Sequence, residues 1–195
     1  MRSAINANEK MNDNTTRKSS ARITLVAGGA RGGKSRYALS KAEERGKALI
    51  FVATAQALDS GMSRRIQHHQ SERGERWQLI EEPLDLAAIL NDAQADQCLL
   101  IDCLTLWLSN WLCLDPDVES VPPGWIEQKT AFLSALETTS AEVILVTNEV
   151  GMGIVPMGQL SRNFVDESGW LHQDIARIAD EVALVMFGIP QVLKS

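Results

Sequence analysis

The sequence predicts an α/β fold in which a mainly parallel sheet is covered by helices on both faces. Two observations support this prediction. From Ile23 onward, short apolar runs of strand length alternate with longer segments that have helical periodicity. The short runs are apolar at consecutive positions rather than at every second one, which is typical of parallel strands buried on both faces.

The expected elements follow one another in a regular order. Strands are expected at residues 23–27, 48–54, 77–81, 98–104, 142–148 and 181–187, with a further edge pairing at 191–194. Helices are expected at residues 34–45, 61–73, 84–93, 106–112, 125–138 and 159–180. A proline- and acid-rich loop is expected at 115–124.

The first 21 residues differ in composition from the rest. They are rich in Asn, Ser, Thr and charge and have almost no large apolar side chains, so we expect residues 1–21 to be a disordered extension. One domain then covers 22–195, a length that suits a single hydrophobic core. The extension has no apolar core of the kind that a secretory signal needs.

Composition indicates a cytoplasmic protein without a transmembrane segment. The most apolar stretch, 98–114, is interrupted by Asp102, Ser109 and Asn110, and it is shorter than the roughly 20 apolar residues of a membrane span. The three cysteines lie in apolar surroundings and are expected to be buried and reduced: Cys98, Cys103 and Cys113.

Charge is distributed unevenly along the chain. The net charge of -6 argues against a nucleic-acid binder. However, residues 31–76 carry ten basic and five acidic side chains, whereas residues 77–142 carry one and twelve. The basic block therefore indicates an anion-binding region in the first half of the chain.

A glycine-rich segment follows the first expected strand and matches the phosphate-loop pattern G-x-x-x-x-G-K-[ST] at every position. Its glycines allow backbone N–H groups to surround phosphate oxygens, and the next helix presents the positive end of its dipole. Lys34 is expected to reach the β- and γ-phosphates, and Ser35 to contact Mg²⁺. The motif predicts a P-loop NTPase-like (RecA-like) fold that binds a nucleoside triphosphate through Gly28, Gly29, Ala30, Arg31, Gly32, Gly33, Lys34 and Ser35.

An acidic partner for Mg²⁺ is expected at the end of a nearby buried strand. Asp102 follows four apolar residues and is the candidate, because a carboxylate in such surroundings is costly without a cation or donor. The alternative is that Asp102 caps the helix that follows.

Two adjacent histidines lie in a basic segment, Arg64 to Arg73. Helical spacing places Arg65, His69 and Arg73 on one face, with His68 about 100° away. The arginines should keep His69 neutral and neutralise phosphoryl charge, which suits a nucleophile that attacks phosphorus. The alternative is a solvated basic helix face. His172 lies in a polar helix and is expected at the surface.

These motifs resemble one enzyme family. GGARGGKS, VATAQALD, RRIQHHQSERGERW and VTNEVGMGIVP, in this order, closely resemble the bifunctional adenosylcobinamide kinase/adenosylcobinamide-phosphate guanylyltransferases of cobalamin biosynthesis. The resemblance covers about residues 23–194 and favours the catalytic interpretation of the histidine segment. The chain departs from the family at Gly32, where serine is common, and Asp102 occupies a position that can be glutamate.

The resemblance implies specific residues and partners. His69 would be the residue that becomes guanylylated, and a homotrimer would be the assembly. The substrates would be ATP, GTP and the corrinoid adenosylcobinamide, with Mg²⁺ as cofactor. Beyond the phosphate loop, the implied nucleotide contacts are Thr54, Ala55, Gln56, Gln70, Ser71, Glu72, Arg73, Glu81 and Asp102.

The implied function is phosphorylation of adenosylcobinamide by ATP or GTP, followed by GMP transfer from GTP through a histidine–GMP intermediate to give adenosylcobinamide-GDP. One alternative is a P-loop small-molecule kinase without nucleotidyl transfer. Another is a GTP switch protein, but the strand end Thr147-Asn148-Glu149-Val150 lacks the N-K-x-D element of such proteins. The loop that begins there is expected to face the corrinoid or, alternatively, to be structural.

Overall fold

The computed structural model describes residues 21–55, 76–114 and 120–195. Within these ranges, one seven-stranded sheet has the order β3-β2-β4-β5-β1-β6-β7. All neighbouring strands are parallel except β6 and β7, which are antiparallel. The strands are β1 (Ile23–Gly28), β2 (Ala48–Ala53), β3 (Trp77–Glu81), β4 (Gln97–Asp102), β5 (Glu142–Asn148), β6 (Glu181–Met186) and β7 (Ile189–Lys194).

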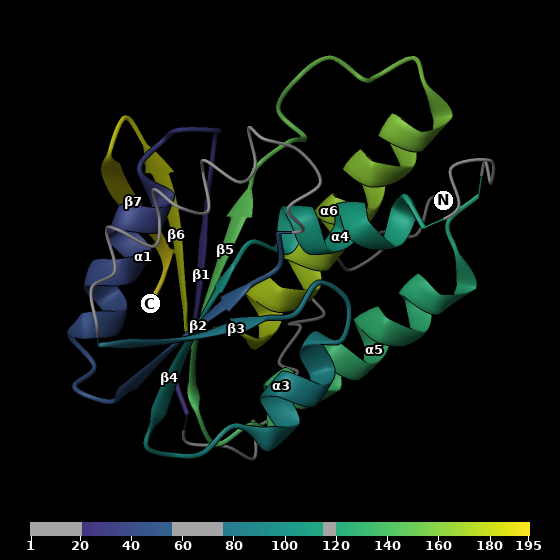
Figure 1. Ribbon diagram of the computed structural model, residues 1–195. Coiled ribbons are helices and arrows are strands. Elements are labelled where there is room, and N and C mark those ends of the chain that lie inside the picture. Colours follow the sequence, from purple (N-terminus) through teal and green to yellow (C-terminus); the bar gives the residue numbers. More distant parts are fainter. Residues whose placement is uncertain (1–20, 56–75, 115–119) are drawn as a thin grey trace, which may run out of the picture.

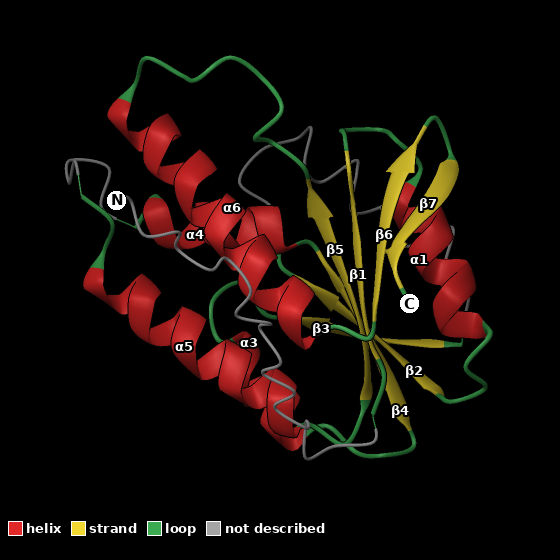
Figure 2. Ribbon diagram, turned by 180° about the vertical axis from the view of Figure 1, so that it is seen from behind, coloured by secondary structure: helices red, strands yellow, loops and turns green. Residues whose placement is uncertain are grey.

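Helices cover both faces of this sheet. Helix α1 lies on one side, and the other four described helices lie on the opposite side, as the two views show (Figures 1 and 2). This confirms the predicted mainly parallel sheet with helices on both faces. The helices are α1 (Lys34–Glu43), α3 (Leu86–Asp92), α4 (Leu104–Leu112), α5 (Pro123–Thr138) and α6 (Gln159–Ile178).

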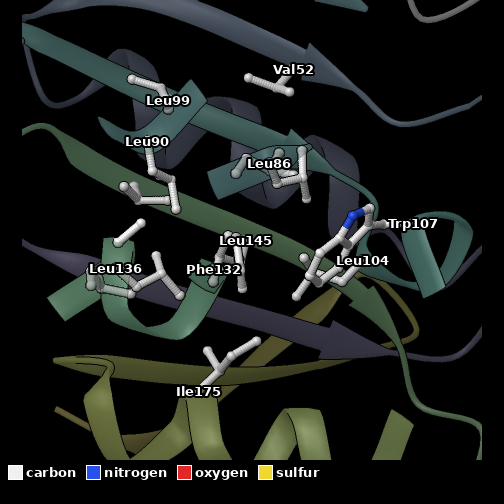
Figure 3. Packing of buried hydrophobic residues seen from close by; sticks show 14 of the residues in the cluster. Val52, Leu86, Leu90, Leu99, Leu104, Trp107, Phe132, Leu136, Leu145 and Ile175 are labelled. Carbon is white, nitrogen blue, oxygen red and sulfur yellow. The ribbon is translucent and has the colours of Figure 1, made fainter. Parts of the chain in front are cut away.

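Alternating side chains of the central strands form two separate cores. In β4, Leu99 and Ile101 join the larger core beneath α3 to α6, whereas Cys98 and Leu100 join the smaller core beneath α1. In the larger core, Trp107 packs on Phe132 with ring centroids 4.8 Å apart (Figure 3). Burial on both faces explains why these strands are apolar at consecutive positions.

Several predicted boundaries were wrong by a few residues. The strand expected at 98–104 ends at Asp102, and the helix after it begins at Leu104 rather than at residue 106. Leu104 is the first residue of the helix and is buried, so the apolar pattern continues across the junction of strand and helix. Helix α5 already begins at Pro123, within the segment expected to be a loop. The expected edge pairing at 191–194 is confirmed as β7, whereas the helix expected at 61–73 lies outside the described residues.

The cysteines and tryptophans fall into different environments. Cys98 and Cys103 are buried free thiols, as expected, but Cys113 is exposed, so the prediction for Cys113 was wrong. Trp107 and Trp125 are fully buried in the core, whereas Trp170 is 54% exposed; Trp111 is partly buried against the core. Among the described helices, none is both long and apolar enough to cross a membrane.

Candidate phosphate-binding site

The phosphate loop connects β1 to α1 at the edge where the parallel strands end. Its backbone is tightly packed: a Cβ on Gly28 would lie 2.2 Å from the carbonyl oxygen of Val185, and Gly28 has a φ of +152°. Gly33 has a φ of +96° and immediately precedes α1. Glycine is therefore required at Gly28 and Gly33 by contact and conformation. The loop matches the strand–loop–helix context that the motif predicts.

Lys34 is the first residue of α1 and is 7% exposed. Its Nζ donates a hydrogen bond to the carbonyl oxygen of Gly29, 2.7 Å away. Burial lowers the pKa of Lys34, and the neighbouring Asp102 and Cys103 partly offset this. A desolvated ammonium group gains more from an anionic partner than a hydrated one does, which suits a phosphate-binding lysine.

Ser35 and Asp102 come together across the sheet edge. The Ser35 hydroxyl donates a hydrogen bond of 2.8 Å to Asp102 Oδ2. The N-cap position of α4 is held by Cys103, and Asp102 lies one residue before it, as the last residue of β4. A hydroxyl and a carboxylate are oxygen donors of the kind that Mg²⁺ takes from a protein, the remaining positions being filled by phosphate oxygens and water. The pair therefore fits a magnesium site beside the phosphate loop.

The other expected nucleotide contacts are only partly described. Thr54 is fully buried, and its hydroxyl donates to the carbonyl oxygen of Cys103 and accepts from the N–H of Cys103, both at 2.8 Å. The Thr54 side chain thus links the ends of β2 and β4. Glu81 ends β3, and its Cα pairs with that of Ala53. Ala55 follows Thr54 directly and is partly buried. Seven further expected residues lie outside the described residues: Gln56, Arg65, His69, Gln70, Ser71, Glu72 and Arg73.

A polar network next to this site was not predicted. His172 was expected at the surface, but its side chain is only 14% exposed. Its Nε2 lies 2.8 Å from Thr147 Oγ1, and its Nδ1 lies 3.9 Å from Glu149 Oε2. The N–H of Glu149 in turn donates to the carbonyl oxygen of Gly28 at 3.0 Å. His172 on α6 is therefore connected through the end of β5 to the start of the phosphate loop.

Protonation of His172 should destabilise the fold. Burial lowers the pKa of His172 below its ordinary 6.5, although Glu149 acts in the opposite direction. As the pH falls below 6.5, this histidine takes up a proton more readily in the unfolded chain than in the folded one. The folded protein is therefore destabilised relative to the unfolded chain as the pH falls. We expect the free energy of unfolding to fall more between pH 7.5 and 5.5 in the wild type than in His172→Asn. Urea unfolding at both pH values measures the difference, and parallel losses in the two proteins would contradict the prediction.

The loop after β5 has an unusually apolar surface. Met152, Ile154, Val155 and Met157 are each at least 73% exposed. Beside the loop, a hollow of about 440 Å³ opens between the C-terminal end of α4 and the first half of α6, and its lining is mostly apolar. The lining residues are Ser109, Leu112, Cys113, Val150, Pro156, Leu160, Ser161, Phe164 and Val165.

Comparison with known proteins identifies the family. A family model described as CobU, cobinamide kinase / cobinamide phosphate guanyltransferase, matches residues 24–193. The chain belongs to this family. Membership of the cobinamide kinase / cobinamide phosphate guanyltransferase family makes it an enzyme of cobalamin biosynthesis and confirms the resemblance seen in the sequence.

Relatives agree over most of the chain. The bifunctional adenosylcobalamin biosynthesis protein CobP of Pseudomonas aeruginosa is 48% identical over 171 residues, which cover 87% of this chain and 96% of the relative. The bifunctional adenosylcobalamin biosynthesis protein CobU of Escherichia coli is 38% identical over 182 residues, 88% of this chain and 99% of the relative. The Salmonella typhimurium protein of the same name is 38% identical over 181 residues, with the same coverage.

Solved structures are similar at a lower level. The RadB recombinase has a TM-score of 0.47 at 14% identity, covering 84% of this chain and 73% of that chain. A structure described as an ATPase domain has the same TM-score of 0.47 and the same 14% identity, covering 84% of this chain and 68% of that chain.

Proposed function

We propose that this enzyme phosphorylates adenosylcobinamide with ATP or GTP and then transfers GMP from GTP to the product, giving adenosylcobinamide-GDP. The observation that carries the proposal is the arrangement of Lys34, Ser35 and Asp102 at one sheet edge, in a chain of the CobU family. Lys34 supplies a desolvated positive charge, and Ser35 and Asp102 supply oxygen donors for Mg²⁺. Bound there, Mg²⁺ would neutralise charge on the phosphate oxygens.

In the first reaction the phosphate loop holds the triphosphate while a substrate hydroxyl attacks the γ-phosphorus. The bond from the γ-phosphorus to the bridging oxygen breaks, and the nucleoside diphosphate leaves. The charge that develops on the transferred group lies close to Lys34 and to the backbone N–H groups at the start of α1. The residues present therefore suit phosphoryl transfer by positioning and charge stabilisation.

In the second reaction we propose His69 as the nucleophile. Its ring nitrogen attacks the α-phosphorus of GTP, the bond to the bridging oxygen breaks, and pyrophosphate leaves. The GMP then passes from His69 to the phosphate of adenosylcobinamide phosphate. Arg65 and Arg73 are proposed to neutralise the phosphoryl charge, because they lie four residues before and four residues after His69 in the sequence, a separation typical of one helix face.

The corrinoid is proposed to approach over the loop after β5. This loop begins beside the first glycine of the phosphate loop, where the N–H of Glu149 donates to Gly28, and it exposes apolar side chains such as Ile154 and Met157. A large macrocyclic substrate needs apolar contact close to the phosphate donor. The homotrimer implied by the family resemblance and the cytoplasmic location indicated by composition stay predictions.

The covalent intermediate provides the test. Wild-type protein incubated with Mg²⁺ and GTP labelled at the α-phosphate is expected to retain acid-labile label at His69, located by peptide mapping. GTP labelled at the γ-phosphate is the control and should leave no label on the protein, since that phosphate departs as pyrophosphate. If cobinamide is phosphorylated but no adduct forms, the chain is a P-loop small-molecule kinase without nucleotidyl transfer.

A further inference from the structure

The turn between β6 and β7 contains a conformational outlier. It has two residues, Phe187 and Gly188, with φ values of +56° and +79°. A two-residue hairpin turn with both φ values positive favours asparagine followed by glycine, and an aromatic residue at the first position is disfavoured. The Phe187 side chain is 94% exposed, so packing does not compensate. Backbone strain in an exposed aromatic residue points to a functional role.

This turn lies directly against the phosphate loop. The N–H of Gly188 donates a hydrogen bond of 2.9 Å to the carbonyl oxygen of Gly32. A Cβ on Gly33 would lie 2.9 Å from the Cα of Gly188, so the two backbones are in contact. In Figure 1 the β6–β7 turn and the segment that joins β1 to α1 occupy the same end of the sheet. Phe187, the residue before Gly188, therefore belongs to a turn that borders the phosphate loop.

The orientation of the phosphoryl donor follows from the strand order. Asp102 ends β4, which is separated from β1 by β5, whereas β6 and β7 lie on the other side of β1. A metal held by the Ser35–Asp102 pair would draw the terminal phosphates to the β4 side. The nucleoside, at the opposite end of the phosphate chain, would then leave the loop on the side of β6 and β7.

We propose that Phe187 binds the nucleobase of the phosphoryl donor by stacking its ring on the purine. The proposal rests on the kinase function proposed above for the phosphate loop. Stacking on an aromatic ring tolerates different bases because every base has a π-face. A base site of this kind accounts for a donor that is either ATP or GTP, since it reads no hydrogen-bonding edge of the purine.

Binding to two probes tests the proposal on the full-length chain. The probes are the β,γ-imido analogue of ATP and inorganic tripolyphosphate, which has no base, each titrated calorimetrically with Mg²⁺. Phe187→Asn is expected to weaken binding of the ATP analogue about tenfold, and to leave binding of tripolyphosphate unchanged. Phe187→Tyr should retain the wild-type affinity for both probes. Because asparagine suits the turn, Phe187→Asn should also have a higher melting temperature than the wild type.

Leu193→Asn is the matched control. Leu193 is an exposed apolar residue on the same hairpin, 61% accessible, at the end of β7 remote from the turn. The Leu193→Asn variant should bind both probes with the wild-type affinity. Unchanged affinity of Phe187→Asn for the ATP analogue would overturn the proposal, as would an equal loss for both probes. A wild-type protein that binds neither probe would overturn the proposed phosphate-loop function and this proposal with it.

Discussion

Lys34→Met is expected to lower kcat/KM for both cobinamide phosphorylation and GTP–pyrophosphate exchange by about 10²- to 10³-fold, the usual cost of removing one charge-stabilising group. In the proposed function both reactions hold a triphosphate in the same loop, so both would lose the same positive charge. Stability should be unchanged or higher, because methionine fills similar volume without the cost of burying an ammonium group. Coupled kinase assays, isotope exchange and urea unfolding measure the three quantities.

Two further variants serve as a control for Lys34→Met and as a means of separating the two reactions. Lys47→Ala is the control: Lys47 also donates to a backbone carbonyl, that of Ala95 at 2.6 Å, but it lies just before β2, at the edge of the sheet where the parallel strands begin. Both activities should persist in it. His69→Ala should lose pyrophosphate exchange and keep phosphorylation, since the histidine is proposed to act only in GMP transfer. Full exchange in His69→Ala would contradict the histidine assignment, and full activity in Lys34→Met would contradict the role of the loop.

Gly28→Ala is expected to lower the free energy of unfolding by about 3 kcal/mol or more, the sum of overpacking and an unfavourable backbone conformation. The added Cβ would meet the carbonyl oxygen of Val185 at 2.2 Å, and neither backbone is free to move without disturbing the pairing of β1 and β6. At this chain length the melting temperature should fall by about 6–12 °C. Displacement of the loop should also abolish nucleotide binding.

The adjacent glycine provides the control for this prediction. A Cβ on Gly29 meets no atom within 4 Å. Gly29→Ala should therefore change the free energy of unfolding by less than about 0.5 kcal/mol. Differential scanning calorimetry gives the melting temperatures of the two variants, which differ only in the position of one added methyl group. Similar melting temperatures of the two variants would contradict the prediction, since they would mean that the backbone at Val185 moves away from the added Cβ at little cost.

Structural features that depend on residues close together in the sequence could be predicted. Consecutive apolar residues identified the buried strands, and the glycine pattern before Lys34 identified the phosphate loop. The boundary between β4 and α4 was predicted wrongly although Asp102 interrupts the apolar pattern, because Cys103 and Leu104 directly after it are apolar and buried as well. The pairing of Ser35 with Asp102 as candidate Mg²⁺ ligands could be anticipated, because Ser35 belongs to the phosphate-loop motif and Asp102 directly follows four buried apolar residues of a clear strand.

Features that depend on distant partners could not be predicted. His172 has polar neighbours in the sequence, and its burial results from packing against Thr147 and Glu149, which belong to another element. Phe187 was assigned to the strand that precedes it, because its turn lacks the Asn-Gly sequence that normally signals a hairpin. In both residues the informative contact exists only after the sheet has formed.

The strand order also constrains when the phosphate loop can exist during synthesis of the chain. The motif lies within the first 35 residues, but β1 is held between β5 and β6, whose residues are 142–148 and 181–186. A growing chain therefore contains the nucleotide-binding sequence long before it contains either strand that fixes its shape. We therefore expect the phosphate loop to take its binding conformation only after β6 has been synthesised, so that nucleotide does not assist the folding of the partial chain through this loop.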